Sequence, residues 1–141
     1  MEIKLTKEES EKFFYNALCN CPGFGGYGLE FIYNDSDYNK AKKTLQKKLD
    51  NGKVPVDMDG SNLRICIENV QMEILRNGGK LKMIDIEGEG EYTREIGLKE
   101  VHERVQKTPV RHLTDMIEEN DDADTADVII QTVFFESVIF A

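Results

Sequence analysis

Apolar residues recur at helical spacing in the first third of the chain. One set follows a capping box formed by Thr6 and Glu9 and predicts a helix over residues 7–19. A second set begins after Asp35 or Ser36, either of which can cap a helix, and ends at Asn51-Gly52. The apolar positions that define these two helices are Phe13, Phe14, Ala17 and Leu18, and then Tyr38, Ala41, Leu45 and Leu49.

Four more helices are predicted further along. The first carries an apolar stripe of Ile67, Val70 and Ile74, and the second runs from Leu98 to about Gln106. Thr108-Pro109 is a helix start signal, and the helix after it should bury Val110, Leu113 and Ile117. The last helix opens at Asp124, because acidic residues are favoured in a first turn.

Alternation and turn residues predict strands. Residues 27–33 are rich in strand-forming residues, and residues 80–87 and 91–96 flank Gly88-Glu89-Gly90 as in a β-hairpin. The length of 141 residues suits one domain. We therefore expect a single α+β domain over residues 1–141, with about six helices and a small, mainly antiparallel sheet that contains this hairpin.

Composition limits the partners and the compartment. A net charge of −9 disfavours binding to nucleic acid or anionic membranes, both of which need surplus cations. No apolar run approaches the roughly 20 residues of a membrane span, so no membrane partner is expected. Three cysteines are an odd number, which excludes a complete disulfide framework and favours a cytoplasmic location.

The charge is unevenly distributed. Residues 36–53 carry a net charge of +4, whereas residues 108–141 carry −7. Ordinary solubility explains much of such a pattern. The more specific interpretation is an acidic C-terminal region that binds a basic partner, or the opposite pole of a second copy of the chain. Its candidate acidic contact residues are Asp121, Asp122 and Asp124.

The C-terminus is unusually apolar, with six large apolar residues among residues 133–140. This segment either closes the core of its own chain or forms an interface with another protein or copy. The aromatic members, which we name as interface candidates, are Phe134, Phe135 and Phe140.

A glycine-rich segment raises the possibility of ligand binding. Residues 23–28 match G-x-G-x-x-G, but here a helix precedes and a strand follows, the reverse of the dinucleotide-binding order. Phe24 and Tyr27 could still form the lip of a small-ligand site. An anionic nucleotide held by these residues and by the basic side chains of Arg104, Arg111 and His112 is our alternative function.

Metal and thiol chemistry receive little support. Residues 57–68 resemble a calcium-binding loop, but Arg64 replaces the usual hydrophobic residue and Asn62 the usual glycine. Cys19, Cys21, His102 and His112 lack the spacing of a zinc site. We expect no metal or cofactor, and an enzyme that uses Cys19 or His102 is the least supported alternative.

The stretches TPVRHL, residues 108–113, and DDADTADVIIQTVFFESVIFA, residues 121–141, resemble small uncharacterised proteins carried by phages and prophages. The resemblance covers roughly the second half of the chain and includes no catalytic motif. It implies an accessory role in binding or inhibition and transfers no site residues. The leading hypothesis is a non-enzymatic binding or regulatory protein that acts through protein–protein contacts.

Overall fold

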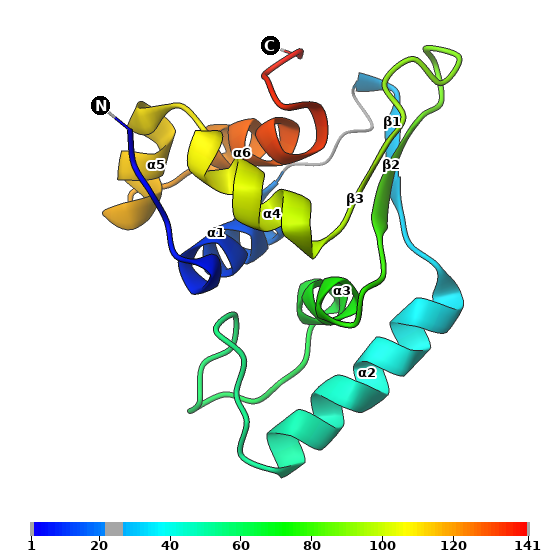
Figure 1. The fold of residues 1–141 in the computed structure, drawn as a ribbon, viewed down its shortest axis with the longest axis vertical. Coiled ribbons are helices and arrows are strands. Elements are labelled where there is room, and N and C mark those ends of the chain that lie inside the picture. Colours follow the sequence, from blue (N-terminus) through cyan, green and yellow to red (C-terminus); the bar gives the residue numbers. More distant parts are fainter. Residues whose placement is uncertain (1, 22–26, 141) are drawn as a thin grey trace.

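The computed structural model describes residues 2–21 and 27–140 (Figure 1). Within this part of the chain, six α-helices and a three-stranded antiparallel sheet confirm the predicted α+β fold. In chain order the elements are α1 (Lys7–Asn20), β1 (Leu29–Ile32), α2 (Asp35–Asp50), α3 (Ile67–Arg76), β2 (Leu81–Asp85), β3 (Arg94–Ile96), α4 (Leu98–Arg104), the short 3₁₀ helix η2 (Val105–Lys107), α5 (Val110–Ile117) and α6 (Ala123–Phe135).

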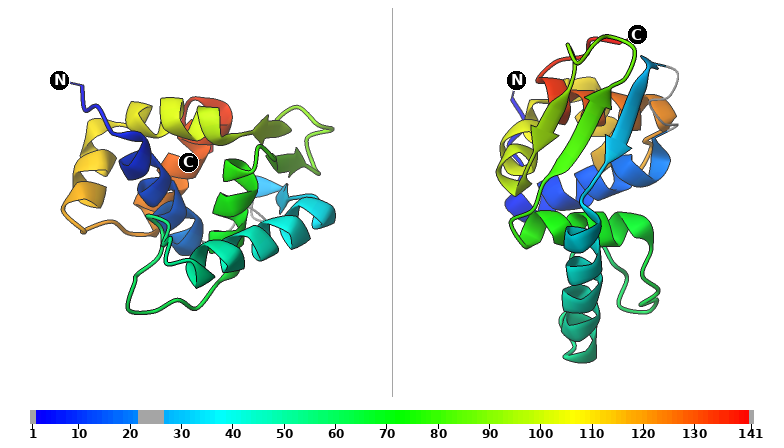
Figure 2. Two further views of the ribbon diagram at one scale, coloured as in Figure 1. Left: turned by 60° about the horizontal axis from the view of Figure 1, so that its bottom comes forward. Right: turned by 90° about the vertical axis from the view of Figure 1, so that its right-hand side faces the viewer.

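The sheet has the order β1-β2-β3, and both strand pairs are antiparallel. The predicted hairpin is β2–β3, although its strands are shorter than expected. The buried carboxylate of Asp85 closes the turn, because it accepts hydrogen bonds from the N–H groups of Gly88 and Tyr92 at 2.6 and 3.0 Å. Leu81 and Met83 point into the core, and the helices cover that face of the sheet (Figure 2).

α6 lies at the centre of the helical layer. It packs against α1, α4, α5 and β3, and most of its side chains are buried. The apolar C-terminus largely closes this core: Phe134 is 1% exposed, and Phe140 stacks on Tyr27 with ring centroids 4.7 Å apart. Gln131 holds the last residues in place, since its Oε1 accepts from the N–H groups of Ile139 and Phe140, both at 2.9 Å.

α2 and α3 pack together and differ from the prediction in detail. Asn34, rather than Asp35 or Ser36, caps α2, because its Oδ1 accepts from the N–H groups of residues 36 and 37. α3 does not bury the simple stripe that its spacing predicts. Ile67 is 53% exposed, whereas Met72 and Glu73 are fully buried. The reason is that α3 lies between α1 and α2 and is enclosed on several sides.

α5 also buries a different face from the predicted one. Val110 and Ile117 are exposed, and the buried side chains are His112, Leu113 and Met116. His112 turns inward because its Nδ1 lies 3.1 Å from the hydroxyl of Thr125 at the start of α6. A polar contact between two helices, which periodicity does not reveal, therefore sets the rotation of α5.

A partly buried ionic network centred on Arg76 joins distant segments. Its guanidinium lies 2.9 Å from the carboxylate of Glu11 in α1 and also pairs with the buried carboxylate of Asp57 in the α2–α3 loop. The network reaches α4 and α2 as well. His102 Nε2 lies 2.9 Å from Glu11 Oε2, and Lys48 Nζ lies 2.8 Å from Glu73 Oε2, which itself lies near Arg76.

Replacing Arg76 by alanine should strongly destabilise the protein. The substitution leaves Asp57 buried without its cation, and breaking a buried pair in this way costs about 3–5 kcal/mol. Urea unfolding measures the change. Lys99→Ala is the matched control, because Lys99 pairs with Glu103 only at the exposed surface and its loss should cost about 0–1 kcal/mol. Equal losses for both variants would contradict a central role for Arg76.

Candidate functional site

α2 presents a basic face to solvent. Ala41, Leu45 and Leu49 anchor the helix in the fold, and the sides of the helix away from them are exposed to solvent. Four lysines are exposed on α2, and none of them forms an ion pair with another described residue: Lys40, Lys42, Lys43 and Lys47. Lys48, which the sequence groups with them, is instead held by Glu73.

The segment that follows α2, residues 51–66, is fixed to the body of the protein at Asp57. Asn69 of α3 donates a hydrogen bond to the Asp57 carboxylate at 2.8 Å, and Arg76 pairs with the same group. Further along, a tight turn is closed by the N–H of Asn62, which donates to the carbonyl of Asp59 at 2.9 Å. Residues 53–62, a mobile loop by composition, thus make specific contacts at both of these points.

This segment and the first residue of α3 expose apolar side chains beside the basic helix. Of the nine large apolar side chains that are exposed in the described residues, four lie between residues 54 and 67: Val54, Val56, Leu63 and Ile67. We call the exposed residues of α2 together with those of segment 51–67 the α2–loop surface. Sequence reasoning missed its apolar part, because the helical spacing placed Ile67 in the core.

A groove of about 390 Å³ lies within the α2–loop surface. Lys42 lines it from α2 and Arg64 from the loop, so two cations face it from different elements, opposed by the carboxylate of Glu68. Tyr38 forms part of its wall and is stacked on Tyr33, with ring centroids 5.1 Å apart. The remaining lining residues are Ile65, Cys66, Ile67 and Val70.

A second cavity of about 360 Å³ adjoins the groove, since Arg64 and Cys66 line both. The thiol of Cys66 lies 2.8 Å from Asn69 Oδ1 and 3.5 Å from the hydroxyl of Tyr15. Loss of solvation raises the pKa of Cys19 to about 11, even though the residue as a whole is exposed. A raised pKa is the opposite of what activates a nucleophilic thiol.

A third cavity, of about 530 Å³, lies where β1 meets α2. Lys80 and Lys82 line it together with the carboxylates of Asp37 and Glu95. Because the charges of this lining balance, the cavity offers less electrostatic preference for a charged partner than the α2–loop surface does.

The structure does not gather the residues predicted to bind a nucleotide. Phe24 lies outside the described residues. The hydroxyl of Tyr27 donates to Asp127 of α6 at 2.8 Å, Arg104 donates to the carbonyl of Val133 at 2.8 Å, and Arg111 lies beside His112, which contacts Thr125. Thr125 and Val133 are about 12 Å apart along the helix, so Arg104 and His112 are held near opposite ends of α6.

The residues predicted to bind a partner also lie in two separate places. Asp121, Asp122 and Asp124 lie around the start of α6, whereas Phe134, Phe135 and Phe140 lie at or beyond its end. Asp122 and Phe134 are separated by about 18 Å at the rise of an α-helix. Phe134 is buried, and Phe135 and Phe140 pack with Tyr92. The acids and the phenylalanines therefore do not form one patch.

Comparison of the chain with protein-family models, with curated proteins and with solved structures found no match. Within the described residues, no group of three or more histidine, cysteine or acidic side chains is arranged to hold a metal ion. Within the same residues, no helix combines the length and apolarity needed to cross a membrane.

The thiol of Cys19 should react with iodoacetamide only at high pH. Below a pKa of about 11 the thiol stays protonated, and only the thiolate reacts. In a variant with Cys21→Ser and Cys66→Ser, the alkylation rate should rise with a midpoint near pH 11, compared with about 8.5 for an unperturbed cysteine. The urea-unfolded variant is the control. If the pH midpoint of alkylation were lower in the folded variant than in the unfolded chain, the Cys19 thiol would be activated. That result would support the alternative in which Cys19 is catalytic.

Proposed function

We propose that this chain is a non-enzymatic binding protein that acts through protein–protein contacts, and that the α2–loop surface is its binding site. The observation that carries the proposal is a groove lined by Lys42, Arg64 and Ile67, on a surface that also exposes further lysines of α2 and further large apolar side chains of the loop. Apolar area supplies binding free energy, and charge supplies orientation and specificity. The partner that fits is a protein segment with both carboxylates and apolar side chains.

An acidic protein suits this surface better than nucleic acid does. The chain carries a net charge of −9, which opposes the approach of a long polyanion. Nucleic-acid affinity comes mainly from many cation–phosphate contacts. Exposed Leu63 and Ile67 have no counterpart on a phosphate backbone, but they can pack against apolar side chains of a protein.

A binding role agrees with the accessory function that the phage-protein resemblance implies, in which a small protein binds or inhibits a larger one. We propose that it acts in the cytoplasm, where thiols such as those of Cys19 and Cys66 remain reduced. The nucleotide alternative predicts that Arg111→Ala removes any stabilisation by nucleotides in a thermal-shift assay.

Labelled synthetic peptides test the proposal by fluorescence anisotropy. An amphipathic peptide with Glu and Leu at helical spacing should bind, a peptide with Ser in place of Leu should bind more weakly, and a Lys–Leu peptide should not bind. The variant K42Q/K43Q/K47Q should weaken binding of the first peptide by at least about tenfold, because charge complementarity is lost.

The matched control is K4Q/K7Q/K12Q, which removes the same charge from exposed lysines outside the α2–loop surface. This control should bind like the unmodified protein. Failure of the Glu–Leu peptide to bind, or equal losses for both triple variants, would overturn the proposed function. Duplex DNA is included as a competitor. If DNA bound to the α2 lysines and the peptide did not, the surface would be a nucleic-acid site instead.

A further inference from the structure

We propose that the partner bound by the α2–loop surface is a second copy of this chain, which docks through the corner between α5 and α6. This inference rests on the proposed function, because it uses the same surface and names its occupant. Such a contact between copies requires an exposed, acidic segment that also carries apolar side chains. This segment must lie far enough from α2 to reach the α2–loop surface of another copy.

The α5–α6 corner has this chemistry. Ile117 is 48% exposed at the end of α5, and Val110 is 38% exposed at its beginning. Five acidic residues lie in the connection from α5 to α6 and in the first turn of α6: Glu118, Glu119, Asp121, Asp122 and Asp124. A hydrogen bond from the N–H of Thr125 lowers the pKa of Asp122, which keeps this carboxylate charged. Within the described residues, these acids form no ion pair, so their charges remain available to a partner.

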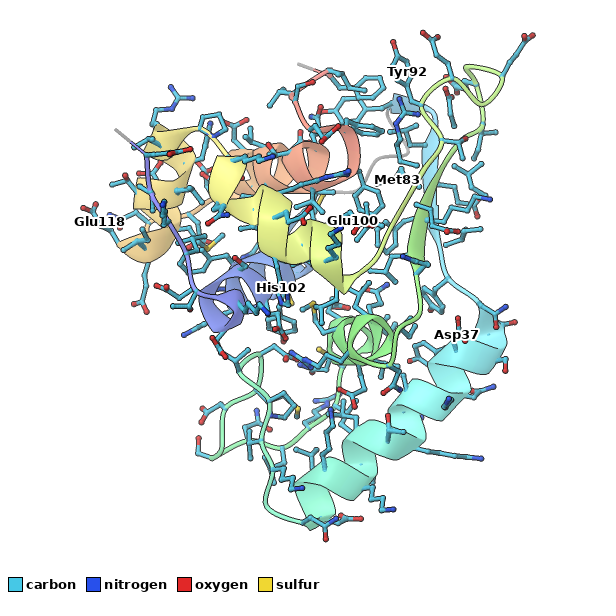
Figure 3. The ribbon with its side chains drawn as sticks, viewed as in Figure 1. Asp37, Met83, Tyr92, Glu100, His102 and Glu118 are labelled. Atoms are coloured by element: carbon cyan, nitrogen blue, oxygen red, sulfur yellow. The ribbon has the colours of Figure 1, made fainter. Side chains whose placement is uncertain are left out.

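α2 and the α5–α6 corner lie far apart in the molecule (Figure 1). Figure 3 places Glu118 at one edge, and α2, which begins near Asp37, at the other. The right-hand view of Figure 2 shows α2 projecting from the body, and Figure 1 shows α2 across the molecule from α5, with the loop that follows α2 below α1. A contact between two unlike, separate surfaces is heterologous, and repeating it builds an open chain or a ring rather than a two-fold dimer.

The charges and the apolar residues of the two surfaces correspond. Four lysines of α2 and Arg64 would face five carboxylates, and Ile117 would pack against the exposed apolar residues of the loop. Because the contact relies largely on solvent-exposed charges, each pair of which contributes little, we expect weak association. Salt should reverse it, since the screening length falls from about 10 Å at 0.1 M salt to 3 Å at 1 M.

Sedimentation velocity of two complementary variants tests the inference. K42Q/K43Q/K47Q neutralises three lysines of the α2–loop surface and leaves the corner unchanged. E118Q/E119Q/D124N neutralises three acids of the corner and leaves the lysines unchanged. Asp122 is left intact because it caps α6. At low salt and high concentration, the unmodified protein should form complexes larger than two copies, and each variant alone should stay monomeric. An equimolar mixture should form a complex of two chains that grows no further.

The result also separates this inference from the proposed function. If the unmodified protein stays monomeric at low salt while the Glu–Leu peptide still binds to it, the head-to-tail contact is wrong and the binding function stands. Association that stops at two copies, or that persists in either variant alone, overturns the contact as well. Circular dichroism and thermal unfolding confirm that both variants are folded before their masses are compared.

Discussion

The fold depends on how Arg76 is neutralised inside the protein. A single guanidinium at the end of α3 is bound by Glu11 from α1 and by Asp57 from the α2–α3 loop, with Glu73 beside it. Burial alone lowers the pKa of Arg76, but the carboxylates of Asp57 and Glu11 raise it above its ordinary value, so the cation persists. Because each partner comes from a different segment, the side chain fixes the arrangement of α1, α3 and the loop at one point.

The exposed α2–loop surface follows from this buried arrangement. Asp57 is held inward by Arg76 and Asn69. Val56 precedes Asp57 directly and is 37% exposed, although its side chain would gain free energy from burial. The interaction that stabilises the loop at Asp57 thus leaves the apolar side chain of Val56 at the surface.

Local sequence signals predicted where the helices and strands lie. Which face of each helix is buried depends on contacts between elements, which local signals do not reveal. The Thr6–Glu9 capping box and the turn after Asp85 act over a few residues, and both form as expected. The rotation of α5 depends on the contact between His112 and Thr125, which are 13 positions apart. The lysines of α2 were visible in the sequence, but the exposure of Ile67 depends on the packing of α3 against two other helices.

The lysines of α2 carry an electrostatic cost that the described part of the chain does not relieve. Lys43 and Lys47 are four positions apart on one helix, a spacing at which like charges destabilise a helix by about 0.2–0.5 kcal/mol per pair. Lys48 shows how such a charge is satisfied internally, since it reaches the buried carboxylate of Glu73. Its exposed neighbours have no such partner among the described residues. Carboxylates supplied by another molecule would remove this repulsion, so binding an acidic surface stabilises the helix that binds it.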